Sequence, residues 1–129
     1  MKYFGTDGLR GRVGEGQLLT KEFVTRLANA IAQYIKVGPV LIGRDTRPSG
    51  VWIEEIFVQV LSSHGLQVSS LGVIPTTALS YIVSRTDAVL GIVITASHNP
   101  PEWNGFKLFD ESGRKLRDED IRIIEGGLK

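Results

Sequence analysis

The chain alternates between two hydrophobic patterns, one typical of helices and one typical of buried strands. Apolar residues recur every three to four positions in 20–36 and 51–64, and more thinly in 117–128, which is the spacing of one face of an α-helix. Short apolar runs bounded by glycine, proline or polar residues predict strands at 40–42, 66–71, 87–95 and 106–110. A third helix is expected between the second and third of these strands, from Thr76, which can cap it, to about Ser84.

Strands that alternate with helices predict an α/β domain. We expect three layers, with a mainly parallel mixed sheet of about four strands between helices and a final antiparallel or edge hairpin. The 129 residues are enough for one domain and not for two.

Composition excludes several functional classes. A net charge of +1 gives no general attraction to nucleic acid or to an anionic membrane. The chain has no cysteine, which excludes disulfides, thiol nucleophiles and thiolate metal sites and suits the cytosol. No apolar run approaches the roughly 20 residues of a membrane-spanning helix. We therefore predict a cytoplasmic protein that binds neither nucleic acid nor membranes.

A stiff polar segment follows the predicted strand 87–95. Ser97 and His98 stand together where this strand should end, and two consecutive prolines restrict the backbone that follows. Asn104-Gly105 is a turn signal, which would return the chain with Lys107 close to where it left. A hydroxyl, an imidazole and an ammonium group on such a loop could handle a phosphoryl group.

A second polar loop, 43–50, follows the strand 40–42. Ligands of open α/β sheets sit beyond the carboxyl ends of strands, so both loops could line one edge, with Arg44 as a candidate phosphate ligand. The alternative is structural: Asp45 pairs with Arg44 or Arg47 and fixes the loop, because adjacent opposite charges most often serve local structure.

The N-terminal segment 4–16 contains five glycines and several charges. It is either a flexible arm or an ordered loop that brings Arg10 to an anion.

Two chemistries are possible for Ser97. A hydrolase triad is rejected, because adjacent side chains on an extended chain point to opposite sides, so His98 is a poor base for Ser97. A phosphoryl carrier fits better. A phosphoserine carries a charge of about −1.5 to −2, which Arg10, His98 and Lys107 can balance, and Lys107 could exchange a proton with a substrate hydroxyl. The structural alternatives are a solvated lysine and a loop held by side-chain bonds to backbone.

Three motifs resemble those of the α-D-phosphohexomutases. Thr95-Ala96-Ser97-His98-Asn99-Pro100, followed by Asn104-Gly105-Phe106-Lys107, is similar to the phosphoserine loop of that family. Gly5-Thr6-Asp7-Gly8-Leu9-Arg10-Gly11 resembles its N-terminal element, in the form of the phosphoglucosamine branch more than the phosphomannose/phosphoglucose branch. The segment 43–49 resembles its Gly-Arg-Asp-x-Arg-x-Ser element.

The resemblance implies roles for four residues. Ser97 would be the phosphorylated serine, and a phosphoserine oxygen would be one ligand of a Mg²⁺ ion. His98 would stay near the transferred group, Lys107 would act as acid/base or phosphate contact, and Arg10 would help to hold the phosphoserine. The implied reaction moves phosphate between the 6- and 1-positions of a phosphorylated hexose or hexosamine through a bisphosphate, as in glucosamine 6-phosphate to glucosamine 1-phosphate.

The resemblance also implies missing parts. The family's enzymes have four domains, and residues 1–129 match the first as a single domain. No Asp-x-Asp-x-Asp segment is present, so the remaining Mg²⁺ ligands would come from another domain, as would the loops that select the sugar. We expect a chain that is inactive without its partner domains and whose exposed apolar faces favour self-association. The alternatives are a phosphomannomutase/phosphoglucomutase domain and a non-catalytic module that binds a phosphorylated ligand.

Overall fold

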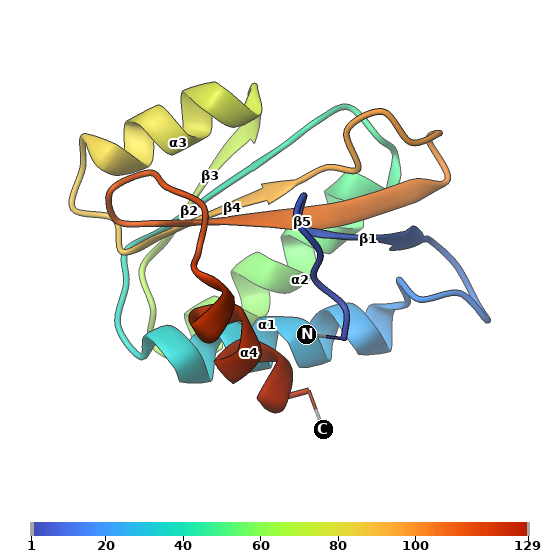
Figure 1. Cartoon of the computed structure of the whole chain (residues 1–129), viewed down its shortest axis with the longest axis horizontal. Helices are drawn as coiled ribbons and strands as arrows, with labels where there is room; N and C mark the ends of the chain where they lie inside the picture. Colours follow the sequence, from blue (N-terminus) through green and yellow to red (C-terminus); the bar gives the residue numbers. More distant parts are fainter. Residues whose placement is uncertain (1, 129) are drawn as a thin grey trace.

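The computed structural model describes residues 2–128, which form four helices and a five-stranded mixed sheet (Figure 1). The α/β class and the layered arrangement are confirmed, with one strand more than the sequence predicted. In chain order the elements are β1 (Leu9–Arg12), α1 (Lys21–Ile35), β2 (Val40–Arg44), α2 (Ser49–Ser63), β3 (Val68–Val73), α3 (Thr76–Ser84), β4 (Leu90–Ile94), β5 (Trp103–Asp110) and α4 (Asp118–Gly126).

The strand order across the sheet is β1-β5-β4-β2-β3. β2 runs parallel to both β3 and β4, whereas β5 is antiparallel to β4 and β1 is antiparallel to β5. The final strand is therefore antiparallel as expected, but it lies inside the sheet, because the N-terminal strand β1 covers its outer side. β1 was not predicted.

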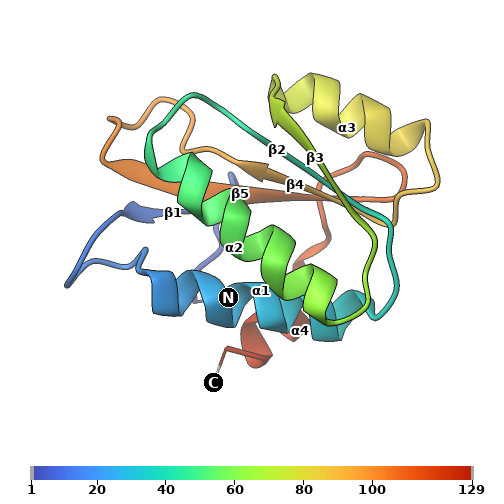
Figure 2. The same ribbon diagram turned by 180° about the vertical axis from the view of Figure 1, so that it is seen from behind.

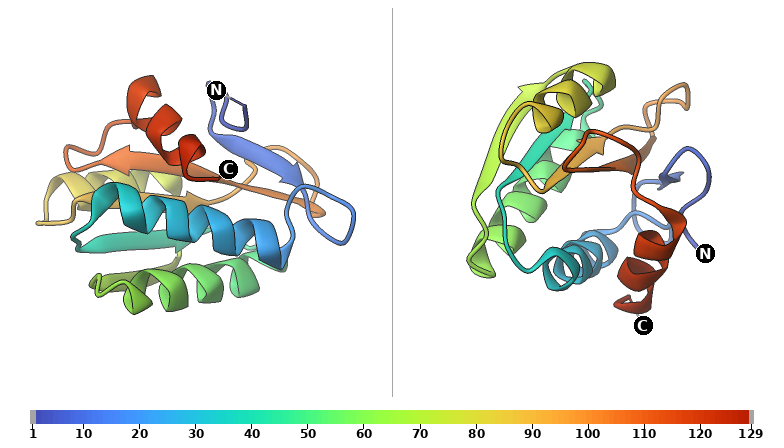
Figure 3. Two further views of the ribbon diagram at one scale, coloured as in Figure 1. Left: turned by 90° about the horizontal axis from the view of Figure 1, so that it is seen from below. Right: turned by 60° about the vertical axis from the view of Figure 1, so that its left-hand side comes forward.

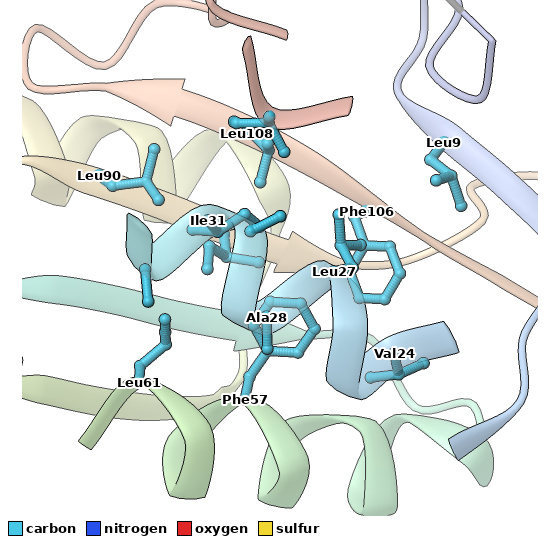
Figure 4. Packing of buried hydrophobic residues seen from close by; sticks show 14 of the residues in the cluster. Leu9, Val24, Leu27, Ala28, Ile31, Phe57, Leu61, Leu90, Phe106 and Leu108 are labelled. Carbon is cyan, nitrogen blue, oxygen red and sulfur yellow. The ribbon is translucent and has the colours of Figure 1, made fainter. Parts of the chain in front are cut away.

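The two faces of the sheet are covered unequally (Figures 1 and 3). α1, α2 and α4 pack on one face over the larger core, where Phe57 of α2 and Phe106 of β5 are fully buried with ring centroids 5.1 Å apart (Figure 4). Burial of each such side chain stabilises the fold by about 1.5–3 kcal/mol. Of the helices in residues 2–128, α3 alone packs on the other face, over a small cluster that includes Leu79, Val83 and Val93.

α1 forms for the reasons that its sequence suggested. The Thr20 side chain accepts a hydrogen bond from the Phe23 N–H at 3.1 Å, so it caps the helix. The apolar stripe that includes Val24, Leu27 and Ile31 is fully buried against the sheet and α2.

Two local predictions were wrong. Asn104 and Gly105 belong to β5 and do not form a turn. The Asn104 side chain is fully buried, where its Nδ2 donates to the Ser49 hydroxyl at 2.9 Å and its Oδ1 accepts the Gly105 N–H, so tertiary bonds override the local turn preference. Thr76 is the first residue of α3 and does not cap it; Pro75 holds the N-cap position, with no side-chain cap bond.

Several large apolar side chains are exposed along β3, α3 and α2, namely Val51, Leu71, Val73 and Tyr81. Such side chains could contact a second copy of the chain, so the self-association expected from the sequence stays a prediction.

None of the helices in 2–128 is both long and apolar enough to cross a membrane.

Candidate functional site

The loops after β2 and β4 lie at the same end of the sheet, as their positions beyond two strands predicted (Figures 1 and 2). β2 and β4 are parallel neighbours, with Arg44 opposite Ile94 in the register. The contact continues beyond the strands, because the Asp45 N–H donates to the Ile94 carbonyl oxygen at 3.2 Å.

Ser97 occupies a tight turn immediately beyond β4. The Asn99 N–H donates to the Ala96 carbonyl oxygen at 3.0 Å, and Ser97 has a φ of 53°. A left-handed backbone costs a residue with a side chain roughly 1–2 kcal/mol, so the surrounding structure has to hold this conformation. The half-buried Ser97 lines a surface cavity that it shares with Asp45, Arg47 and Asn99.

Arg47 bonds the Ser97 loop through its guanidinium group. Nη2 donates to the backbone carbonyl oxygen of Ser97 at 2.7 Å. Nη1 donates to three further backbone carbonyl oxygens, those of Asn99 at 2.8 Å, Pro100 at 2.7 Å and Trp103 at 3.3 Å. The arginine is buried.

Asp45 joins the same network from the other side. Its Oδ2 accepts hydrogen bonds from Arg47 Nε at 2.9 Å and from the Thr95 hydroxyl at 2.6 Å. The oxygen of the same hydroxyl, Thr95 Oγ1, accepts a hydrogen bond from the Ser97 N–H at 3.0 Å. The structural interpretation of Asp45 is therefore confirmed with Arg47 as partner. Arg44 pairs instead with Glu54, Nε to Oε1 at 3.3 Å.

Arg10 approaches the Ser97 loop from β1. It lies opposite Gly105, and its Nη1 is 3.4 Å from Asn99 Oδ1. Glycine is required at 105, because a Cβ there would meet the carbonyl oxygen of Leu9 and lie 3.0 Å from that of Thr95. Among the described residues 2–128, the buried Nε of Arg10 has no hydrogen-bond partner, so this guanidinium keeps an unused donor beside the loop.

The N-terminal segment is ordered rather than a free arm. The buried carboxylate of Glu125 in α4 accepts hydrogen bonds from the N–H groups of Lys2, Tyr3 and Phe4 at 2.5–2.9 Å. Burial opposes ionisation of this carboxyl, but the bonds from Phe4, Lys2 and Tyr3 outweigh it and hold its pKa below the ordinary value of 4.5.

The other predicted site residues lie apart from this network. His98 is exposed on the turn. Lys107 is opposite Val93, which packs under α3, so it shares that face of the sheet with Arg10 at a diagonal Cα separation of about 7–8 Å. Its side chain lines a groove beside residues 4–8 and not the Ser97 cavity. Of the two predicted cations outside the loop, Arg10 reaches it and Lys107 does not.

Two features of this site were missed by sequence reasoning. One is β1, although Leu9, Gly11 and Val13 alternate with two arginines in the period of a strand. The other is the bonding of Arg47 to a loop fifty residues away, for which the local sequence contains no signal.

The site offers a hydroxyl on a held turn, with the guanidinium groups of Arg10 and Arg47 bonded to the same loop, a combination suited to a phosphoryl group. No group of three or more His, Cys, Asp or Glu side chains that could hold a metal ion is found in the part of the chain that the structure describes.

Comparison with known proteins extends over the whole chain. Two phosphoglucosamine mutases are similar, that of Xanthomonas campestris pv. campestris at 44% identity over 98% of this chain and that of Polaromonas naphthalenivorans at 46% over 99%. The chain spans only 29% and 30% of their lengths.

Solved structures agree with the fold. A Thermus thermophilus protein assigned as a phosphomannomutase superposes with a TM-score of 0.90 at 33% identity, over 98% of this chain and 29% of that one. Parafusin from Paramecium, a phosphoglucomutase, has a TM-score of 0.85 at 20% identity over 99% of this chain and 25% of its own, which supports the fold alone. Residues 1–129 match the family description "Phosphoglucomutase/phosphomannomutase, alpha/beta/alpha domain I", and the chain belongs to this family.

Proposed function

We propose that the chain is the phosphoserine-bearing domain of a phosphohexomutase that interconverts glucosamine 6-phosphate and glucosamine 1-phosphate, the first of four domains. The observation that carries this is the placement of Ser97 on a held turn with the Arg10 guanidinium 3.4 Å from Asn99, two residues along. The phosphoglucosamine mutases at 44–46% identity favour this sugar over mannose or glucose.

The proposed chemistry is one phosphoryl transfer run in both directions. Ser97 Oγ bonds to phosphorus of a hexosamine 1,6-bisphosphate as the bond from phosphorus to the sugar oxygen breaks, and the serine proton ends on that oxygen. In the reverse direction, the phosphoserine donates to a sugar hydroxyl. Arg10 balances the charge on the phosphoserine, His98 stays near the transferred group and Lys107 exchanges the proton.

Mg²⁺ would bind a phosphoserine oxygen and neutralise charge during transfer, with its other ligands outside this chain. Arg44 remains a candidate contact for the substrate phosphate, provided that this contact replaces its pairing with Glu54.

The test is phosphate uptake measured by intact mass. The chain is incubated with glucosamine 1,6-bisphosphate and Mg²⁺, alone and mixed with the missing domains of a related enzyme. We expect one stable phosphoryl group on the wild type, none on Ser97→Ala, and an unchanged result for Ser62→Ala, which alters an exposed serine of α2.

Equal uptake from mannose or glucose bisphosphate would favour the phosphomannomutase/phosphoglucomutase alternative. Absence of uptake even with the missing domains would refute the carrier and favour a module that only binds phosphorylated ligands.

A further inference from the structure

We propose that Arg47 is a positioning residue, which holds Ser97 in the conformation from which its hydroxyl receives and donates phosphate. The catalytic part of this inference rests on the proposed function, whereas the conformational part does not. Ser97 adopts a φ of 53°, a region that residues with side chains rarely occupy. Something outside the turn therefore has to stabilise it.

The carbonyl side of Ser97 is fixed by Arg47. Its guanidinium donates to the carbonyl oxygens of Ser97, Asn99 and Pro100 at 2.7–2.8 Å and to that of Trp103 at 3.3 Å. These oxygens lie on the first and second halves of the loop, so one planar group ties its two ends together. An arginine suits this role, because it offers five donors in a fixed plane and stays charged.

The amide side of Ser97 is fixed by the same network. The Ser97 N–H donates to the Thr95 oxygen, and the Thr95 hydroxyl donates to Asp45 Oδ2, which also accepts Arg47 Nε at 2.9 Å. Both peptide groups that flank the Ser97 Cα are therefore bonded to one connected set of side chains. Since these groups define φ and ψ, they also define the point from which the hydroxyl extends.

Arg47 acts through the backbone and not on the reacting atoms. Within residues 2–128, its bonds to the loop go to carbonyl oxygens, and none goes to the Ser97 hydroxyl. The residue is also buried, at 9% exposure, and its donors are engaged by the loop and by Asp45. Its loss should misplace Ser97 without changing the groups that bind the sugar.

The test uses the full 129-residue chain, with Arg47→Lys and Arg47→Ala as variants. Arg117→Lys is the matched control, because that arginine is exposed and pairs with Glu119 and Asp120 of α4. Nuclear magnetic resonance gives backbone amide order parameters for the non-proline residues 97–99 and 102–103. We expect values of about 0.85 in the wild type and control, and below about 0.6 at 97–99 in both variants, with the helices unchanged.

Phosphate uptake from the hexosamine bisphosphate, with the missing domains present, gives the second readout. In Arg47→Lys the rate at saturating donor should fall about 100-fold, while the donor concentration that gives half the maximal rate stays the same. If Arg47 only stabilised the fold as a whole, the rate at saturating donor would not fall selectively while the half-saturating donor concentration stayed the same. Free guanidinium ion should restore part of the rate in Arg47→Ala.

An ordered loop with unchanged Ser97 signals in the variants would overturn the inference, as would a disordered loop with an unchanged saturating rate. If Arg47→Ala does not fold, Arg47→Lys decides. If the wild type takes up no phosphate, the proposed function fails, and the order parameters still decide whether Arg47 holds the loop.

Discussion

The two segments that meet at Arg10 and Asn99 are held by buried side chains of opposite charge. The Ser97 loop is bonded at its carbonyl oxygens by the cation Arg47, and the N-terminal segment is bonded at its N–H groups by the anion Glu125. A guanidinium keeps its charge at any pH that a protein meets, whereas a carboxylate can be neutralised by acid. The bonds of Arg47 to the carbonyl oxygens of the Ser97 loop should thus persist at any pH, whereas the bonds of Glu125 to the N-terminal segment depend on its ionisation.

Gly105→Ala should have the largest effect on stability. It forces the N-terminal segment and the Ser97 loop apart, even though Glu125 and Arg47 still hold each of them. The new Cβ would meet the carbonyl oxygens of Leu9 and Thr95, which belong to backbone and cannot rotate away. We expect a loss of about 3 kcal/mol in the free energy of unfolding, measured with urea.

Gly126→Ala is the matched control, since a Cβ there meets nothing within 4 Å. It should be neutral or slightly stabilising. Equal stability of the two variants would contradict the close approach of β1 to β5.

Glu125→Gln should release the N-terminal segment alone. The amide keeps one acceptor but turns a donor toward backbone N–H groups, so we expect a loss of about 2 kcal/mol and faster amide hydrogen exchange at Tyr3 and Phe4. Glu119→Gln, on the exposed side of the same helix, should change stability by less than about 0.5 kcal/mol. Faster exchange in the Ser97 loop of Glu125→Gln would show that the two segments are not held independently.

Acid should loosen the N-terminal segment. The pKa of Glu125 is lowered in the folded protein, so its stabilisation is complete above about 4.5, the value in the unfolded chain, and is lost as the pH falls through the folded value. Denaturation of the wild type and Glu125→Gln between pH 7 and 2.5 should give a stability difference that shrinks with acid.

Asp110 also contributes to the pH dependence of folding, because its contribution to the free energy of unfolding is likewise lost as the pH falls. Burial opposes its ionisation, but bonds from Ser112 and Arg114 lower its pKa. Asp110→Asn should remove its own share of the pH dependence and leave that of Glu125 intact. A difference between wild type and Glu125→Gln that is constant with pH would refute this account.

Thr95→Val should have the smallest effect. It keeps the shape of a buried side chain but removes the hydroxyl that links Ser97 N–H to Asp45. We expect a loss of about 1 kcal/mol in the free energy of unfolding. Amide hydrogen exchange should become faster at Ser97 and stay unchanged at Phe4. Thr46→Val, on the exposed part of the neighbouring loop, should leave that amide unchanged.

The parts of the fold that the sequence predicted are those in which local pattern and burial agree. α1 and α2 follow their apolar stripes, and the parallel strands β2 and β4 follow from short apolar runs, which also places their loops at one edge. The pairing of β1 with the outer side of β5 could not be predicted in the same way. β1 is short and lies in the glycine-rich segment 4–16, and it becomes a strand through its pairing with β5.

The arrangement of the candidate site could be predicted where it follows from the local sequence, and it was missed where it depends on distant partners. Ser97 and Arg10 could be identified from motifs, and the structure brings Arg10 to the Ser97 loop. The turn expected at Asn104-Gly105 was wrong, because a buried bond to Ser49 places these residues in a strand. The role of Arg47 depends on carbonyl oxygens, which every residue possesses, so no side-chain pattern could reveal it.

The fastening of residues 2–4 to Glu125 has a consequence for synthesis on the ribosome. Arg10 is made before residues 103–106, with which its strand pairs, and before α4, whose Glu125 bonds residues 2–4. A nascent chain that has not reached residue 125 already contains β2, β3 and β4, while residues 2–4 still lack the carboxylate that bonds their N–H groups. Arg10 thus reaches its place beside the Ser97 loop only after most of the sheet has been made.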